Sequence, residues 1–373
     1  MSLIKAVEVF ADPDLAGLEP VWRQVLSQDP DATVFQTWEW NSAWWRILRA
    51  GARAHVMVAH GQDGPLAIAP VAIRRAAGGA FRCVHFLGAG VSDYLGFIGA
   101  PETLPQCVRA FVAALLETRA WHLIDLQQLS PAHAARAGLG EGLLPACSGA
   151  PPAEARWSAQ DVCPVMPLPE TWEEAMRRVG KKTRSNIGYY ERLLRRDFEV
   201  SIGAAAGDDV PVALEEFFCL HARRWRRRGL PGALYSRRLL DFHRAVAPEL
   251  ARSGHLALHR LRLNGKTAAA LYCFQFRSRA FYYLGGFEPA LARYSPGTVL
   301  TAHAIRAAIS GGCTEFDFLR GREPYKYRWP VEERTNCRLV IPRRGSSRSR
   351  LALRWSAWQQ RALSAARTVL QGA

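Results

Sequence analysis

The segment from Phe281 to Trp329 constrains the fold more than any other part of this 373-residue sequence. It begins as a tyrosine-rich strand pattern, breaks at a Ser-Pro-Gly-Thr turn (295–298) and continues as a helical pattern. A second strand pattern and a polar cluster (321–329) follow. A small-residue turn that opens a helix leaves backbone N–H groups free for an anion, and the helix dipole favours the same charge. The segment therefore predicts a site for a donor that carries phosphate.

Both halves of the sequence show three strand patterns, a helical pattern and one more strand. In the second half these lie at 255–263, 266–276, 280–286, 298–310 and 314–319, with a favoured Asn-Gly hairpin turn at 264–265. A weaker copy lies at 53–59, 65–74, 81–88, 103–118 and 122–126. An internal repeat of this length predicts two related lobes. We expect an α/β (α+β) fold in which each lobe is a mixed, mainly antiparallel sheet flanked by helices.

The boundaries follow from this pattern. We expect an N-terminal lobe at 1–160, a donor-binding lobe at 161–341 and a basic amphipathic tail at 342–373. The tail predicts one apolar stripe, formed by Leu351, Trp355, Trp358, Ala362, Ala365 and Val369. Three arginines, Arg350, Arg354 and Arg361, border the stripe. Such a helix rests either on the anionic surface of the inner membrane or in a hydrophobic groove of the protein itself.

The net charge and the cysteine spacing indicate the cellular compartment and the charge of the binding partners, but they do not identify a partner. Lys and Arg number 49 against 33 Asp and Glu, for a net charge of +16, which favours anions. The eight cysteines never approach CxxC spacing, which is typical of buried thiols in a reducing compartment. Neither a signal-peptide core nor a membrane-length apolar run occurs. We expect a cytoplasmic protein, either free or peripheral to the inner membrane.

Several short strings, in order, resemble those of the CelD/BcsL-type GNAT family, the cellulose-biosynthesis-like acetyltransferases. They are FLG (86–88), SDY (92–94), KTRSNI (182–187), LHARRW (220–225), YSPG (294–297), FDFLRG (316–321) and YK (325–326). They are more distantly similar to the FemABX aminoacyl-transferases with twin GNAT lobes. The resemblance implies an acyl-CoA co-substrate, acetyl-CoA or longer. The usual GNAT pyrophosphate loop, Arg/Gln-x-x-Gly-x-Gly/Ala, is replaced here by residues 294–298, so an aminoacyl-tRNA donor stays open.

The donor site is predicted at the start of the helix after the turn. Its members are Ser295, Pro296, Gly297, Thr298 and Val299, of which the last three would point their N–H groups at the donor. Lys326, beside Tyr325 and Arg322, would bind a phosphate or stabilise charge on the acyl oxygen. A structural salt bridge from Lys326 to Glu323 or Asp317 is the alternative.

The acceptor amine must lose a proton before it attacks, because an alkylammonium has a pKa near ~10. Asp93 and His221 are the two candidate bases. Further acceptor-side candidates are Tyr94, Arg184, Asn186, Trp225, Tyr283, Asp317 and Arg322. We expect no metal, since His255 and His259 share a strand face without a third ligand.

Together these features predict a GNAT-type acyltransferase that moves an acyl group from a CoA thioester to an amine or hydroxyl. The resemblance implies a small-molecule, lipid or sugar acceptor among cell-envelope precursors, either exopolysaccharide or lipid. Two alternatives remain: a FemABX-like transferase that uses aminoacyl-tRNA, and a non-catalytic GNAT-like scaffold of a polysaccharide machine.

Overall fold

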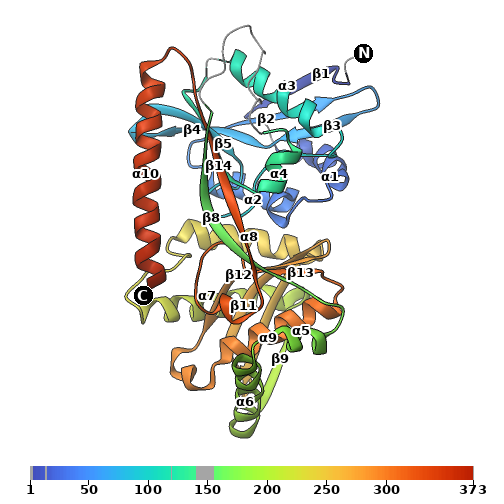
Figure 1. Ribbon diagram of the computed structural model, residues 1–373, viewed down its shortest axis with the longest axis vertical. Helices are drawn as coiled ribbons and strands as arrows, with labels where there is room; N and C mark the ends of the chain where they lie inside the picture. The colour runs from blue at the N-terminus through green and yellow to red at the C-terminus, as the bar shows by residue number, and fades with distance from the viewer. Residues whose placement is uncertain (1–2, 13–14, 119, 140–154, 373) are drawn as a thin grey trace. The chain divides into compact units, whose positions relative to one another are not determined.

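The chain folds into two compact units. The computed structural model describes residues 3–12, 15–118, 120–139 and 155–372, with side chains as far as residue 362. Unit 1 comprises residues 1–161 and 335–369, and unit 2 comprises residues 162–334 and 370–373. Each is described by itself below (Figure 1).

Unit 2 is built on a sheet with the strand order β8-β13-β12-β11-β10-β9. The strands are β8 (Arg156–Pro167), β9 (Val200–Ala204), β10 (Leu256–Leu263), β11 (Lys266–Phe276), β12 (Arg279–Phe287) and β13 (Glu315–Asp317). Neighbouring strands are antiparallel, except for β12 and β13, which run parallel. The β10–β11 turn lies at Asn264 and Gly265, whose positive φ values of 48° and 78° suit a two-residue hairpin.

Helices cover both faces of this sheet. They are α5 (Trp172–Arg178), α6 (Lys181–Asp197), α7 (Val210–Arg226), α8 (Arg237–Arg252) and α9 (Pro296–Ser310). Leu271 of β11 joins the core formed with α6 and α9, whereas the ring of the next residue, Tyr272, contacts Phe217 of α7 and His243 of α8. Because successive strand residues point to opposite faces, α6 and α9 lie on one face and α7 and α8 on the other.

Unit 1 repeats this plan. Its sheet order is β6-β3-β2-β4-β5-β7-β14, with β1 paired to β2, and β5 and β7 are parallel as β12 and β13 are. The strands are β1 (Ala6–Ala11), β2 (Arg53–His60), β3 (Pro65–Ala69), β4 (Val71–Ala76), β5 (Phe81–Phe86), β6 (Ile98–Gly99), β7 (Leu123–Leu129) and β14 (Glu332–Pro342). The helices are α1 (Glu19–Gln28), α2 (Trp38–Leu48), α3 (Leu104–Glu117) and α4 (Pro131–Arg136). The predicted α/β fold with repeated lobes is confirmed.

The final helix, α10 (Ser347–Gly372), packs against unit 1. Ala352 is fully buried in a cluster with Phe81, Cys83, Leu123 and Val340. Arg338 of β14, itself buried, donates to both carboxylate oxygens of Asp125 at 2.6 Å and also to Ser356 and Gln360 of α10. One face of the tail therefore docks on the protein itself.

The docked face coincides with the predicted stripe only in part: Trp355 packs against the cluster, with its ring 6.4 Å from that of Phe81. Ser349, Ala352 and Ser356 are buried, whereas Leu351 is 54% exposed and Trp358 is 65% exposed. Leu351 and Trp358 of the predicted stripe therefore point to solvent. The small side chains of Ser349, Ala352 and Ser356 face unit 1 instead, because they allow the helix to pack closely against the sheet. The side chains of Ala365 and Val369 lie outside the described residues.

Most predicted elements are present within a few residues, with two differences. The predicted strand at 65–74 is interrupted at Pro70, which separates β3 from β4, because proline has no N–H to donate to a ladder. The strand β14 was not predicted. Of the connection expected at 130–160, residues 140–154 lie outside the described part, while α4 and the start of β8 occupy its ends.

Candidate functional site

The parallel strands β12 and β13 of unit 2 separate after three residue pairs. The pairs are Arg279–Glu315, Ala280–Phe316 and Phe281–Asp317. Strand β12 continues to Phe287, but β13 ends at Asp317, whose Oδ1 accepts from the N–H of Leu319 at 2.7 Å. Leu319 has a φ of 56°, so the chain turns away from β12 there. Among the described strands none pairs with this edge of β12 at residues 282–287.

A strand edge of this kind leaves backbone groups free to bind an extended ligand. The opposite side of β12 carries a register shift between Tyr272 and Cys273 of its neighbour β11. Bulges of this kind bend a strand and occur frequently beside active sites. The diverging edge of β12 is therefore the candidate donor site.

The start of α9 differs from the prediction in its hydrogen bonds. Ser295 has a left-handed conformation (φ 47°, ψ 47°) and the helix begins at Pro296, as expected. However, the N–H groups of Thr298 and Val299 donate to the Ser295 carbonyl at 2.9 and 3.3 Å, so they do not point at a donor. A Cβ atom added to Gly297 would meet nothing closer than Phe287, at 3.6 Å. Of the three predicted N–H donors, only that of Gly297 is left for a ligand.

Lys326 is held by its own loop. Its Nζ lies within hydrogen-bond distance of three carbonyl oxygens, those of Leu319 (3.0 Å), Arg320 (2.8 Å) and Gly321 (3.2 Å). It also pairs with Glu323 at 2.9 Å, and the side chain is 3% exposed. An ammonium has three N–H donors, and these acceptors use all of them. The structure thus contains the alternative salt bridge to Glu323, and the contact of Lys326 with the donor stays a prediction.

Tyr325 forms a phenol pair with Tyr282 of β12. Their rings are 5.9 Å apart and their hydroxyl groups share a hydrogen bond. Burial raises the pKa of Tyr282 to about 12, with Arg224 opposing the shift, and burial raises the pKa of Tyr325 well above its ordinary value. Both phenols therefore stay protonated at neutral pH and can donate a hydrogen bond.

His221 of α7 is buried and neutral. Burial lowers its pKa to about 4, although the bond to Gly285 opposes the shift. Its Nδ1 lies 3.2 Å from the Gly285 carbonyl, an acceptor, so Nδ1 carries the proton and Nε2 carries the lone pair. Among the described residues Nε2 has no hydrogen-bond partner. His221 thus has the tautomer that a general base needs.

Gly285 of β12 is contacted both by α7 and by the phenol of Tyr282. Its carbonyl accepts from Arg224 Nη1 at 3.3 Å as well as from His221. A Cβ atom added to Gly285 would lie 2.3 Å from the hydroxyl of Tyr282. At the next residue, Gly286, a Cβ would lie 2.5 Å from the backbone nitrogen of His221. Only a glycine pair permits this close packing of α7 and the phenol against the strand.

Arg224 is the site residue that the sequence prediction omitted. Its guanidinium lies 5.3 Å from the ring of Phe287, at the end of the unpaired edge, and its charge acts on Tyr282, Tyr325 and His221. The signal was present in the sequence as the Gly285-Gly286 pair, which marks a close approach to a strand. The arginine that makes this approach could not be chosen among its neighbours in the run 223–228.

The two acceptor-side candidates Trp225 and Tyr283 each lie beside a buried histidine, His221 and His243 respectively. The Trp225 and His221 rings are 6.0 Å apart, and a Cβ added to Gly232 would meet both. Tyr283 contacts His243, a buried histidine whose pKa burial lowers to about 3. The segment containing Gly232 therefore covers this face of the site.

The remaining predicted residues of unit 2 are exposed at the surface or hold the turn at Leu319. Arg184 and Asn186 are exposed on α6, and Arg184 donates to the Met176 carbonyl at 3.1 Å. Arg322 is exposed and pairs with Glu333 at 2.7 Å. Asp317 is buried and fixes the turn at Leu319, a structural role.

Asp93 and Tyr94 belong to unit 1, where both are buried. The backbone carbonyl of Asp93 accepts from Asn336 at 2.6 Å, and the preceding Ser92 accepts from the Trp40 indole at 2.8 Å. The loop of Asp93 is therefore fixed from two sides.

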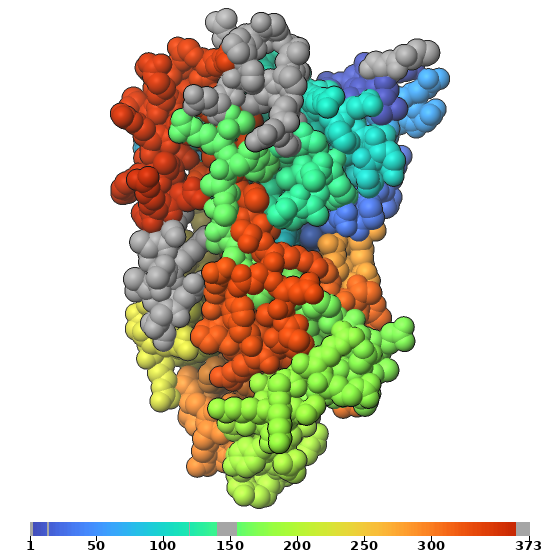
Figure 2. All heavy atoms as spheres, viewed as in Figure 1, coloured from blue at the N-terminus to red at the C-terminus, as the bar shows by residue number. Residues whose placement is uncertain are grey.

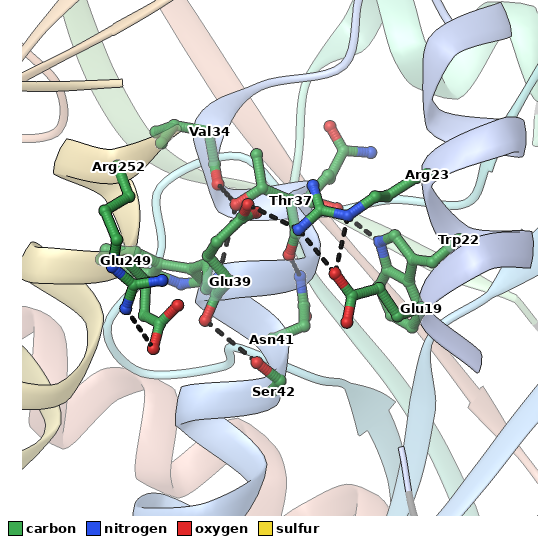
Figure 3. A network of polar contacts seen from close by, with 12 residues as sticks. Glu19, Trp22, Arg23, Val34, Thr37, Glu39, Asn41, Ser42, Glu249 and Arg252 are labelled. Carbon is green, nitrogen blue, oxygen red and sulfur yellow. Dashed lines mark hydrogen bonds and ion pairs between the residues drawn. The ribbon is translucent and has the colours of Figure 1, made fainter. Parts of the chain in front are cut away.

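A polar network that includes Arg23, Thr37, Glu39 and Asn41 lies at the start of α2 (Figure 3). Thr37 caps the helix by accepting from the Trp40 N–H, and Asn41 donates to the Thr37 carbonyl at 2.8 Å. Glu39, 4% exposed, pairs with Arg23 at 2.9 Å. These bonds hold α2 and thereby support the loop that carries Asp93.

No group of three or more potential metal ligands occurs in the described part of the chain. His259 contacts His303, with ring centroids 5.7 Å apart, and burial lowers the pKa of His259 to about 4.

Residues 181–327 match the acetyltransferase (GNAT) domain family. This region contains the diverging strands, the start of α9, His221 and the phenol pair. The match supports the prediction that the protein is an acyltransferase, and that prediction is confirmed. No curated protein matches the sequence.

Solved structures share the fold over nearly the whole chain. FemX superposes with a TM-score of 0.65 at 11% identity, covering 87% of this chain and 96% of FemX. The C-terminal domain of a putative lysylphosphatidylglycerol synthetase from Agrobacterium fabrum gives a TM-score of 0.55 at 15% identity, covering 91% and 95%. L-PGS from Bacillus licheniformis gives 0.54 at 12% identity, covering 93% and 96%.

These likenesses concern the fold alone. They confirm the distant resemblance to FemABX proteins at that level, whereas the CelD/BcsL resemblance stays a prediction. Within the described residues, no helix combines the length and the apolar character that crossing a membrane requires.

Proposed function

We propose that the protein transfers an acyl group from a CoA thioester to an amine, or to a hydroxyl, of a cell-envelope precursor. The observation that carries the proposal is the unpaired edge of β12 beside the start of α9, inside the matched acetyltransferase region. An extended pantetheine-like chain fits a free strand edge, because it can exchange hydrogen bonds with the backbone. The N–H of Gly297 and the helix dipole would favour its phosphates.

The chemistry then follows from two groups of unit 2. The amine nitrogen attacks the acyl carbon, the C–N bond forms, and the C–S bond breaks to release a thiol. His221 Nε2 would accept the proton of the amine, and a protonated phenol of the Tyr282–Tyr325 pair would donate to the departing sulfur or to the developing oxyanion. The segment around Gly232 would have to move, because it covers Nε2 in this conformation.

Thermal stabilisation by CoA tests the donor site. Gly297→Val would place methyl groups where the donor phosphates approach and should abolish the shift in melting temperature caused by CoA. Gly203→Val on β9 is the matched control, because a Cβ there meets nothing within 4 Å. A CoA shift that persists in Gly297→Val would move the donor site elsewhere.

Acyl transfer itself is tested by mass spectrometry with a panel of acyl-CoAs and amines, including amino sugars and long-chain amines. A product that gains the acyl mass is the expected result. The absence of any transfer while CoA still binds would favour the non-catalytic scaffold.

A second candidate is transfer from aminoacyl-tRNA, the activity implied by the FemABX resemblance. The fold shared with FemX and the net charge of +16 favour it. It predicts tRNA binding that weakens steeply as salt rises, together with little stabilisation by CoA. The CelD/BcsL resemblance favours the CoA donor and an exopolysaccharide acceptor.

A further inference from the structure

The outward face of α10 carries apolar and basic side chains together. Leu351 and Trp358 lie seven residues, or two helical turns, apart and so form one ridge. Both are large, and both are more than half exposed. The exposed Arg350, Arg354 and Arg361 lie beside this ridge. The first half of α10 lies at the surface of the molecule (Figure 2, red).

This face cannot be the one that docks on unit 1, because the docked face is already filled. Ser349, Ala352 and Ser356 occupy the inner side, roughly opposite Arg354 and Trp358 at 100° per residue. Leu351 and Trp358 therefore stay exposed although the helix is fully packed against unit 1 on its other side.

The charge of the face is also uncompensated. Residues 343–373 contain seven arginines and no Asp or Glu. In the described part of the chain, the side chains of Arg350, Arg354 and Arg361 take part in no ion pair or hydrogen bond. Arg350 and Arg354 are four residues apart, where like charges repel on a helix. A negatively charged partner would remove this repulsion.

We propose that the outward face of α10 binds an anionic lipid surface without crossing it. Headgroup phosphates meet Arg350, Arg354 and Arg361, and the Leu351–Trp358 ridge enters the boundary between headgroups and acyl chains. Lipid suits the face better than a polyanion such as RNA, because the aliphatic Leu351 gains affinity only where it leaves water. This inference does not depend on the proposed acyl transfer.

The test is sedimentation of the full chain with vesicles of phosphatidylcholine alone or mixed in equal parts with phosphatidylglycerol. We expect binding to the mixed vesicles only, weakened by salt. The triple variant Arg350→Gln, Arg354→Gln, Arg361→Gln should lose roughly a hundredfold in affinity, about fivefold per arginine. Leu351→Ser with Trp358→Ser should lose at least tenfold at unchanged charge. All five positions are exposed, so the melting temperature should stay unchanged.

A charge-matched control separates this face from the general positive charge. Arg192→Gln, Arg195→Gln and Arg238→Gln remove the same charge from exposed positions of α6 and α8 and should leave vesicle binding unchanged. Equal loss in the control, or equal binding to both kinds of vesicle, would overturn the inference. Binding of total tRNA that is lost in the α10 triple variant, with no vesicle binding by the wild type, would reassign the face to nucleic acid.

Discussion

Replacing Lys326 by Met separates the two roles that a buried lysine beside the donor site can have. The substitution keeps the length of the side chain but removes the ammonium from three carbonyl oxygens. The carbonyl of buried Leu319 loses a charged donor, at about 2 kcal/mol. The carbonyls of half-buried Arg320 and Gly321 can bond to water instead, at about 0.5 kcal/mol each. The partly exposed Glu323 adds little.

The expected loss in the free energy of unfolding is therefore about 3 kcal/mol, or roughly 10 °C in melting temperature for a unit of this size. Urea denaturation followed by circular dichroism measures it, with Lys266→Met, an exposed lysine of β11, as the control. Stability equal to that of the wild type, together with a tenfold loss of acyl transfer, would refute the structural role. The ammonium would then act on the ligand, as the sequence first suggested.

Three further predictions concern His221, Gly286 and pH. His221→Gln should lower kcat about a hundredfold and leave the CoA shift unchanged, and an unaltered kcat in a mass-spectrometric assay would remove it as the base. Gly286→Ala should cost about 1–3 kcal/mol in urea denaturation, because its Cβ would press on the backbone of α7, whereas Gly203→Ala should cost far less. Burial lowers the pKa of several histidines from 6.5 to about 4 or 3, so the unfolded chain takes up protons first as the pH falls. These are His85, His133, His221, His243 and His259. Stability should be complete above pH 6.5 and should fall towards pH 4, by up to about 2 kcal/mol per histidine at about pH 5. Urea curves at pH 7 and pH 5 that coincide would contradict this.

Local sequence patterns were sufficient to predict the strands and helices that have a regular hydrophobic periodicity and clear turn residues at their ends. The strands around the Asn264–Gly265 turn and the helix after Pro296 were predicted because both the periodicity and the turn residues are encoded locally. Strand β14 was not predicted, because its first half, 332–338, is polar. It is held by contacts such as Arg338 with Asp125, which are 213 residues apart and leave no local signal.

At the candidate site, too, the locally encoded features were predicted, whereas those that depend on tertiary contacts were not. The sequence located the diverging strands and the helix start, since both follow from chain order. It could not show that Lys326 turns back on its own loop, because a left-handed residue at 319 determines where the three carbonyls point. Nor could it choose between Arg224 and its neighbours, whose directions depend on the phase of α7.

The return of the chain to unit 1 has a consequence for synthesis on the ribosome. Unit 2 takes most of its residues from one stretch, 162–334, whereas unit 1 combines residues 1–161 with residues 335–369, which follow that stretch. Until β14 has been synthesised, one edge of β7 has no strand partner, and Asp125 lacks its ion pair with Arg338. During synthesis, the core formed by residues 162–334 can thus fold before unit 1 has received β14 and the helix that follows it.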